Sequence, residues 1–578
     1  MPSTSIEHLL NQLDVASRDF TPAGEKAIQQ ILARLANQRF TDAESLVRFH
    51  EILLFLSAYP QSARVRHLAE SLLKSFDKRV AALSEAGADL SHMDHPELSG
   101  IAGRSLTDTF TYPIVRWLVD RAPNRVALDW EWFEDENRLA ETWPRFMPLL
   151  EEDAFVEANV PYETWLSAAS AGSVKDLVWL VQRFESLAKS DRKTEKEIAE
   201  LFDGQKLYVS WTPPYRETRT GMRIPAEKIF YHRGPLIRRS DVSLKNELEK
   251  PPPSLIRLSS KQGEAMLDMA RAASTVRYRE LYGFTHGDPN RVFKTNIGRG
   301  VDIFIMGLPP NRRLPLRAYH AALIFKNGVP VGYFEGISLF ERMEGGFNLY
   351  YTFRAGETAW LYARTLNIFR HLLGVTAFSL DPYQIGYQNE EGIESGAFWF
   401  YRKLGFRPTN PGVMKLVLNE ERKMATRPGY RTRTQTLRKL AQGSMIFELD
   451  KPPRKSSSDS SPGDWDRFQV RNIGLAVQRR MAERFAGDAE KFRAATVEGL
   501  ARELGLSTND WRGPKSSVLS DFGFALSLVE DLGRWNKVEK EALVKIIRAK
   551  ATSDESSYLK LMQKHTRLRR AMIKLGSQ

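Results

Sequence analysis

Cysteine is absent from this chain of 578 residues. Its absence excludes disulfide bonds, zinc sites built on thiolates and a cysteine nucleophile. Long apolar runs are missing as well, since no stretch reaches the roughly 18–20 residues that a helix needs to cross a bilayer. The N-terminal sequence MPSTSIEHLLNQLDVASRDF carries polar and acidic residues where a signal peptide would need an apolar core. We therefore expect a cytoplasmic protein with no membrane partner.

Candidate metal ligands are sparse. The ten histidines are scattered singly, except His92 and His95, which the stretch HMDH places beside Pro96 in an expected surface loop. The stretch DWEWFED at 129–135 alternates carboxylates with aromatic residues. Carboxylates next to each other in sequence point to different sides, so we expect an amphipathic face there. The sequence therefore predicts no metal site.

The net charge of +13 is placed unevenly along the chain. Residues 1–250 are mildly acidic, residues 251–420 are mildly basic, and residues 421–578 carry the largest excess of lysine and arginine. Such a basic region binds nucleic acid or another acidic partner in some proteins and is only a solvated helical surface in others. Both interpretations stay open, and we favour the second.

Length and patterning predict an α+β protein of several domains. Apolar residues recur at helical spacing near both ends, as in ESLVRFHEILLFLSAY and VEKEALVKIIRAKA. Two stretches interrupt the pattern, EKPPPSLIRLSS and DKPPRKSSSDSSPGD. The predicted organisation is a helical N-terminal region (1–90), a mostly helical second region (91–248), a proline-rich linker (249–260), a mixed α/β domain (261–420), a basic, partly disordered linker (421–464) and a helical C-terminal region (465–578).

The central domain combines helix and strand patterns. The dipeptide Asn327-Gly328 accepts the positive φ angles of a tight turn, which predicts a hairpin. Gly374 and Gly405 are placed to end helices. In chain order we expect a helix at 261–284, strands at 301–310, 318–340 (two) and 345–353, a helix at 354–374, a strand at 375–383, a helix at 395–405 and a last strand, VMKLVL, at 413–418.

Residues 396–406, GAFWFYRKLGF, resemble the closing signature of the GNAT superfamily of acyl-coenzyme A-dependent N-acyltransferases. The matching positions are Ala397, Tyr401, Lys403, Leu404, Gly405 and Phe406. The stretch KNGVPVGYFEG is similar to the hairpin that carries the superfamily's G-x-x-V-G pattern. The chain also resembles a group of bacterial multidomain proteins that share NGVPVGY, TFRAGE and SGAFWFYRKLGF in this order. The resemblance covers about 257–420 and implies a GNAT-like fold there.

The resemblance implies acetyl-CoA or another acyl-CoA as cosubstrate. A strand, a glycine-containing turn and a helix N-terminus together present free N–H groups and the positive end of a helix dipole, which suit a pyrophosphate. The residues expected there are Phe353, Arg354, Gly356, Glu357, Thr358 and Ala359. The turn departs from the superfamily pattern, because Arg354 and Gly356 are one residue too close and Glu357 adds a negative charge. An acidic first helical turn is the alternative explanation for Glu357.

In the superfamily, the tyrosine that matches Tyr401 often protonates the departing thiolate, so the resemblance implies a general acid. The alternative is an aromatic side chain that only packs between helix and sheet. For the base that accepts the proton of the amine we expect Glu335, with Tyr350 and Tyr351 as further residues of the cleft. An asparagine that is frequent near the signature is replaced here by Glu394.

The sequence therefore predicts an N-acyltransferase that moves an acyl group from acyl-CoA to an amine. One alternative is an enzyme of the same fold that uses an aminoacyl-tRNA, which the irregular turn and the basic stretch 422–455 would suit. Another is a non-catalytic scaffold that binds a protein or nucleic acid. The turn at 353–359 separates them: N–H groups open to a ligand favour an enzyme, and a turn filled by Glu357 favours a scaffold.

Overall fold

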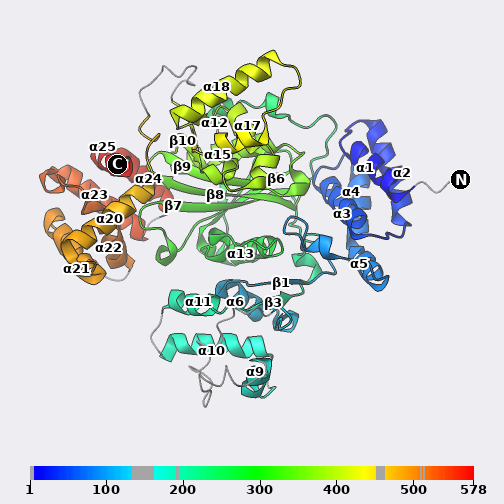
Figure 1. Cartoon of the computed structure of the whole chain (residues 1–578), viewed down its shortest axis with the longest axis horizontal. Coiled ribbons are helices and arrows are strands. Elements are labelled where there is room, and N and C mark those ends of the chain that lie inside the picture. The colour runs from blue at the N-terminus through cyan, green and yellow to red at the C-terminus, as the bar shows by residue number, and fades with distance from the viewer. Residues whose placement is uncertain are drawn as a thin grey trace. The chain divides into compact units, whose positions relative to one another are not determined.

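The computed structural model describes residues 5–132, 162–172, 174–190, 194–450, 463–507, 511, 514–552 and 554–578 (Figure 1). The acidic stretch beyond Trp132 and residues 451–462 of the second expected linker lie outside these ranges. The chain divides into two compact units. The first comprises residues up to 235 with 265–285 and 326–330, and the second comprises 236–264, 286–325 and 331–578.

The first unit begins with five helices between Ile6 and Glu85, which confirms that the N-terminal region is helical. They are α1 (Ile6–Ser17), α2 (Pro22–Ala36), α3 (Ala43–Ala58), α4 (Ala63–Lys74) and α5 (Phe76–Glu85). Side chains of Ser5, Thr21, Asp42 and Ser62 accept hydrogen bonds from the first turns of α1 to α4. Such caps satisfy N–H groups that have no partner inside the helix and so fix where each helix begins.

A small antiparallel sheet and further helices complete the first unit. The strands β1 (Leu106–Asp108), β3 (Val209–Trp211) and β2 (Val126–Leu128) lie side by side in this order. The helices are α6 (Tyr112–Arg121), α9 (Tyr162–Ser170), α10 (Asp176–Ser190), α11 (Glu195–Asp203), most of α13 (Ser260–Thr275) and α14 (Tyr282–Thr285). The rings of Tyr112, Phe184 and Phe202 pack together and form a core between helices α6, α10 and α11.

The second unit contains a mixed sheet in the order β11-β12-β10-β9-β8-β7-β6-β5-β4. The strands are β4 (Leu255–Arg257), β5 (Val292–Asn296), β6 (Val301–Met306), β7 (Ala318–Lys326), β8 (Val329–Leu339), β9 (Arg342–Leu349), β10 (Ala377–Leu380), β11 (Arg407–Pro408) and β12 (Met445–Glu448). Asn327 and Gly328 join β7 to β8 with φ angles of 50° and 82°. The predicted hairpin is therefore confirmed.

Two strands lie where the sequence predicted linkers. β4 falls within 249–260 and pairs with β5, and β12 falls within 421–464 and pairs with β10 and β11. Each is short, and its hydrogen-bonding partner is distant in sequence, so local composition did not reveal it. The sheet thus extends past residue 420, the predicted end of the central domain.

The predicted last strand, VMKLVL, is wrong, because these residues belong to helix α18 (Pro411–Thr426). Asn410 begins this helix by accepting hydrogen bonds from the N–H groups of Gly412 and Val413, and Pro411 occupies the first position. Val413 and Val417 are buried on the same face, four residues apart. A short apolar run does not by itself distinguish a strand from a helix.

Helices cover one face of the sheet, as Figure 1 shows for α12, α15, α17 and α18. The second unit has these helices before the C-terminal region: α12 (Leu244–Glu249), α15 (Thr358–Leu373), α16 (Glu390–Glu394), α17 (Ala397–Lys403), α18 and α19 (Thr434–Leu440). Phe369 of α15 stacks on Phe334 of β8 with ring centroids 5.0 Å apart. Gly374 ends α15 in the left-handed conformation, with φ of 75°, as predicted.

The C-terminal region is helical, as predicted, and belongs to the same compact unit as the sheet. Its helices are α20 (Val470–Phe485), α21 (Ala489–Leu504), α22 (Pro514–Leu526), α23 (Lys537–Thr552), α24 (Glu555–Lys564) and α25 (Thr566–Gly576). The Gln563 amide of α24 donates to the carbonyls of Phe340 and Leu373 at 3.0 and 2.9 Å. Among the described residues, no helix is long and apolar enough to span a membrane.

Candidate functional site

Strands β9 and β10 separate in the middle of the sheet. β9 pairs with β8 along its whole length, from Arg342 to Leu349. It pairs with the parallel strand β10 only through residues 342–344, opposite 377–379. Beyond Glu344, β9 continues without β10 beside it. The sheet therefore has an interior strand whose second half is paired on one side.

The unpaired side of β9 carries backbone groups that a ligand can bind. The Tyr350 N–H donates to the Val331 carbonyl at 3.0 Å. Because residues of an antiparallel strand alternate between the two sides, the backbone N–H and C=O groups of Phe347 and Leu349 point to the side of β10. The Leu349 carbonyl accepts a hydrogen bond of 3.1 Å from Arg354 Nε. We refer to Phe347 and Leu349 as the open edge of β9.

The turn after β9 leads into the N-terminus of α15. The N–H of Gly356 donates to the Phe353 carbonyl, and the N–H of Leu361 donates to the Glu357 carbonyl, both at 2.9 Å. The N–H groups of Thr358, Ala359 and Trp360, which lie between them, have no acceptor among the described residues. Three such groups at the positive end of a helix dipole are suited to an anion.

Two residues of the predicted phosphate turn have structural partners. Phe353 is 1% exposed and belongs to the core. The Arg354 guanidinium contacts the Glu391 carboxylate as well as the Leu349 carbonyl, and it lies 5.8 Å from the centre of the Tyr351 ring. Arg354 therefore holds the turn against β9 and α16.

Glu357 is completely buried, and its carboxylate points away from the free N–H groups of α15. It accepts hydrogen bonds from the Ile237 N–H at 3.2 Å and from Arg299, whose Nε lies 3.1 Å from Oε2. Its side chain does not cap the helix. Arg299 compensates the negative charge that the sequence placed near the expected phosphates. The turn is therefore not filled by the Glu357 carboxylate.

Tyr401 lies in an aromatic cluster above the sheet. Its ring centroid is 5.5 Å from that of Tyr362 and 5.8 Å from that of Phe406, and Tyr362 in turn lies 5.1 Å from Phe347 on the open edge of β9. Tyr401 is 4% exposed, and burial raises the pKa of its hydroxyl. The hydroxyl has no hydrogen-bond partner among the described residues. It is therefore protonated at neutral pH, the form that a general acid needs.

Glu335 lies on the opposite face of the sheet from Tyr401. Side chains alternate along a strand, and Phe334 of β8 packs on α15, so its neighbour Glu335 points away from that helix. The Tyr319 hydroxyl donates a hydrogen bond to its carboxylate. Burial raises the pKa of Glu335 while this hydrogen bond opposes the shift. The structure thus does not bring the two predicted catalytic residues onto one face.

The other residues suggested by the sequence occupy different environments. Tyr350 is buried, whereas Tyr351 is 58% exposed. Glu394 is exposed at the end of α16. In the loop with His92, His95 accepts a hydrogen bond from the Glu97 N–H at 3.3 Å. Within the described ranges, no group of three or more histidine, aspartate or glutamate side chains is arranged to hold a metal ion.

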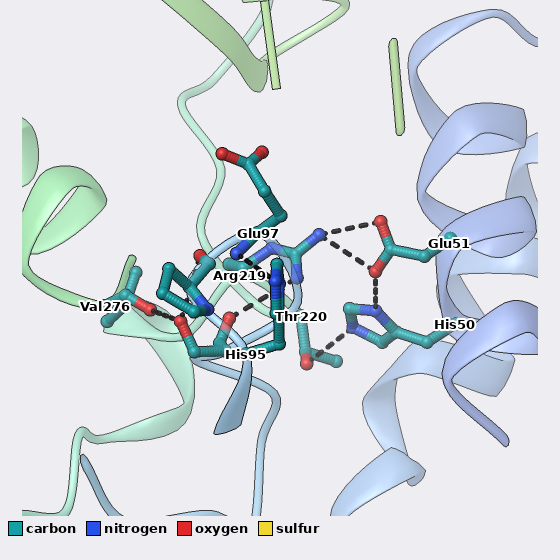
Figure 2. Close-up of polar contacts among 9 residues, drawn as sticks. His50, Glu51, His95, Glu97, Arg219, Thr220 and Val276 are labelled. Atoms are coloured by element: carbon teal, nitrogen blue, oxygen red, sulfur yellow. Dashed lines mark hydrogen bonds and ion pairs between the residues drawn. The ribbon is translucent and has the colours of Figure 1, made fainter. Parts of the chain in front are cut away.

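A second polar cluster lies inside the first unit, and sequence reasoning missed it (Figure 2). His50 Nδ1 is 2.9 Å from Glu51, and its Nε2 is 2.9 Å from the Thr220 hydroxyl. Arg219 donates two hydrogen bonds to Glu51, at 2.9 and 2.7 Å. The Glu51 carboxylate can only accept, so His50 Nδ1–H donates to it, and Nε2 of the neutral ring accepts from the Thr220 hydroxyl, which itself accepts from the Ala102 N–H.

This Thr–His–Glu order is that of a nucleophile, a base and an orienting carboxylate. However, His50 is 0% exposed and Thr220 is 1% exposed, so a substrate does not reach the hydroxyl. The cluster joins α3 to two loops that are distant in sequence. Its role is therefore to hold the first unit together.

Acidification is expected to destabilise the first unit through His50. Burial lowers the pKa of His50 below its ordinary value of 6.5, so below that pH the unfolded chain binds a proton that the folded chain excludes. Stability is then fully present above pH 6.5 and falls as the pH drops toward the folded-state pKa. The melting temperature of wild type should fall more steeply below pH 6.5 than that of His50→Gln.

The difference in melting temperature between wild type and His50→Gln, followed against pH, isolates the contribution of His50. His320 of the second unit is also buried with its pKa lowered to about 4, but it contributes equally to wild type and variant. His50→Gln itself should be less stable at pH 7.5, because it disturbs the buried hydrogen bonds of His50 with Glu51 and Thr220. Parallel melting curves of wild type and variant against pH would contradict the assignment.

One side of the sheet therefore combines the open edge of β9, three free N–H groups of α15 and the Tyr401 ring, while Glu335 lies on the other. No signal in the sequence indicated Arg299 as the partner of Glu357, because the two are distant in the chain. Comparisons with protein-family models, with curated proteins and with solved structures give no match to this chain.

Proposed function

We propose that the chain is an acyl-CoA-dependent N-acyltransferase. The observation that carries this proposal is the separation of β9 from β10 directly before a helix whose first N–H groups are free. A parted strand offers backbone hydrogen bonds to an extended arm, and the helix N-terminus offers them to a pyrophosphate. Coenzyme A carries both groups in one molecule. The resemblance of residues 396–406 to the GNAT signature supports the same conclusion.

In this proposal the acyl donor makes three contacts. Its pyrophosphate accepts hydrogen bonds from the N–H groups of Thr358, Ala359 and Trp360. Its pantetheine arm runs along the open edge of β9, where the Phe347 backbone is available. The thioester then lies near the aromatic cluster that contains Tyr362 and Tyr401.

The reaction joins the amine nitrogen to the acyl carbon and breaks the bond between that carbon and sulfur. The departing thiolate takes the proton of the Tyr401 hydroxyl, which solvent restores afterwards. The amine must lose a proton before or during its attack. Glu335 is the candidate base, and its raised pKa brings the carboxylate closer to the range in which bases act at neutral pH. Because Glu335 lies on the other face, the amine approaches from that face.

Acetyl-CoA should bind the full chain with heat detectable by calorimetry, and Thr358→Glu should weaken this binding. A carboxylate at the first position of α15 stabilises the helix but repels a phosphate at the same place. We expect affinity to fall roughly three- to tenfold, the effect of about 1 kcal/mol that a charge near a helix end produces. The full chain is needed, because β12 and the C-terminal helices belong to the same unit as the site.

Thr358→Gln is the matched control. Both variants lose the hydrogen bond of 2.9 Å from the Thr358 hydroxyl to the Arg354 carbonyl, and only the glutamate adds charge. Equal affinity of the two variants would contradict the placement of the pyrophosphate. Absence of heat with wild type at millimolar acetyl-CoA would contradict the proposed donor.

A further inference from the structure

A pocket of about 620 Å³ lies beside strands β9, β10 and β12, whose lining residues come from the face of the sheet opposite α15, and the start of α18 closes it at the edge of the sheet. Arg342 of β9 lines it, and alternation along β9 puts Arg342 and Phe347 on opposite faces. Ser379 of β10 and Ile446 of β12 continue the same wall. The charged residues that line it are Arg342, Arg407, Lys415, Asp466, Arg467 and Arg471, and we call it the basic pocket.

The two inner cations of the basic pocket are fixed by their neighbours. Arg342 donates to the Ser379 hydroxyl at 2.9 Å and to the Glu344 carboxylate at 3.2 Å. Arg407 lies 2.6 Å from Glu448 and 2.8 Å from Asp466. Each inner cation therefore has a carboxylate partner, and Asp466 is engaged with Arg407. The inner wall is rigid and close to neutral.

The three outer cations have no such compensation. The outer cations are Lys415 of α18, Arg467, which precedes α20, and Arg471 of α20; all three are exposed and have no hydrogen-bond or ion-pair partner among the described residues. They come from two segments that are distant in sequence and line the same pocket. Single exposed cations are ordinary on protein surfaces, but three cations around one cavity create a positive potential that attracts anions.

We propose that the basic pocket binds a small ligand that carries a phosphate or diphosphate group. Two guanidinium groups and one ammonium group around one pocket match the several oxygens of such a group, since guanidinium binds phosphate through paired hydrogen bonds. Trp465 and Phe468 also line the pocket and offer apolar surface for the rest of the ligand. A pocket of this size admits a small molecule and not the backbone of a nucleic acid duplex.

The proposal is independent of acyl transfer, because no residue of the open edge of β9 or of the first turn of α15 lines the pocket. Its test uses the full chain and inorganic pyrophosphate at constant ionic strength, with inorganic phosphate as a second probe. Calorimetry should show saturable binding of pyrophosphate to wild type, and weaker binding of phosphate. The double variant Arg467→Gln with Arg471→Gln should lose about tenfold or more in affinity, as removal of charged hydrogen bonds does.

Arg479→Gln provides the matched control, since Arg479 is exposed on the same helix α20 but does not line the pocket. It should bind pyrophosphate as wild type does. Equal binding by wild type and the double variant would overturn the proposal, and so would binding of a long RNA without binding of pyrophosphate. Because the substituted side chains are exposed, an unchanged melting temperature will show that the double variant is folded.

A competition experiment separates this site from the donor site. If acetyl-CoA binds wild type without displacing pyrophosphate, the two ligands occupy different places, as we expect. Suppose instead that acetyl-CoA displaces pyrophosphate and that the double variant binds neither ligand. The basic pocket is then a phosphate site, and the placement of the donor at α15 is wrong. If only Thr358→Glu weakens pyrophosphate binding, the basic pocket is not the site.

Discussion

Replacing Tyr401 with phenylalanine is expected to lower the rate of acyl transfer by roughly 10²–10⁴-fold, the usual contribution of a positioned proton donor. The variant removes one hydroxyl that has no hydrogen-bond partner among the described residues and keeps the ring in its cluster. Its stability and its affinity for acetyl-CoA should therefore change little. The rate is measured as release of the coenzyme thiol with a thiol-reactive dye. The chain contains no cysteine, so the protein itself gives no background.

Tyr362→Phe is the control for this experiment. Tyr362 is a buried tyrosine beside Tyr401, so its variant loses the same atom in the same surroundings. A general acid predicts a large loss for Tyr401→Phe alone. Similar and small losses in both variants would assign Tyr401 to packing, and a similar large loss in both would show that the aromatic cluster acts through its geometry. Neither of the last two results is compatible with our proposal.

The acid is also expected to leave a signature in the pH dependence. Burial raises the pKa of the Tyr401 hydroxyl, so this group stays protonated throughout the neutral range. The rate falls at alkaline pH when the acid loses its proton. This fall should thus begin only above the ordinary pKa of a tyrosine, near 10. The raised pKa also makes the hydroxyl a weaker acid, and contact with the developing thiolate must offset this.

The parts of the fold that could be predicted from sequence are those fixed by local chemistry. Asn327-Gly328 fixes a hairpin because the two residues tolerate positive φ, and Gly374 ends α15 for the same reason. The strand predicted for VMKLVL is wrong, because a run of six apolar and basic residues suits either a strand or a helix. The choice depended on Asn410 and Pro411, which begin α18 just before it. Strand β12 was not predicted, because its partner β10 is distant in the chain.

In the candidate site too, features set by local sequence could be predicted, and features set by distant residues could not. The glycine-containing turn and the start of α15 could be located from sequence, but the direction of the Glu357 side chain could not. Its partner Arg299 precedes it by 58 residues, and the ion pair offsets the negative charge that would oppose a phosphate at this turn. Likewise, alternation along β8 puts the side chains of Phe334 and Glu335 on opposite faces of the sheet. Only the packing of Phe369 on Phe334 shows that Phe334, and not Glu335, is on the same face of the sheet as Tyr401.

Lys550→Met is expected to lower the free energy of unfolding of the second unit by about 3–5 kcal/mol, the cost of leaving a buried charge without its partner. Lys550 of α23 is 1% exposed and Glu555 of α24 is 4% exposed, and the two form an ion pair. The Lys550 ammonium also donates to the Arg317 carbonyl at 2.8 Å, and Glu555 accepts from the Tyr319 N–H at 3.2 Å. The measurement is chemical denaturation, with hydrogen exchange of peptides from β7 and α24 to locate the change.

Two further variants decide what the loss means. Lys550→Met combined with Glu555→Gln removes both charges and keeps an acceptor for the Tyr319 N–H, so it should be more stable than Lys550→Met alone. Lys560→Met, an exposed position on α24, should stay within about 0.5 kcal/mol of wild type. Exchange should accelerate in β7 and α24 together, because the ion pair ties the C-terminal helices to the segment that begins β7. Faster exchange in α24 alone would show that these helices unfold without the sheet, and the C-terminal region would then be an independent module.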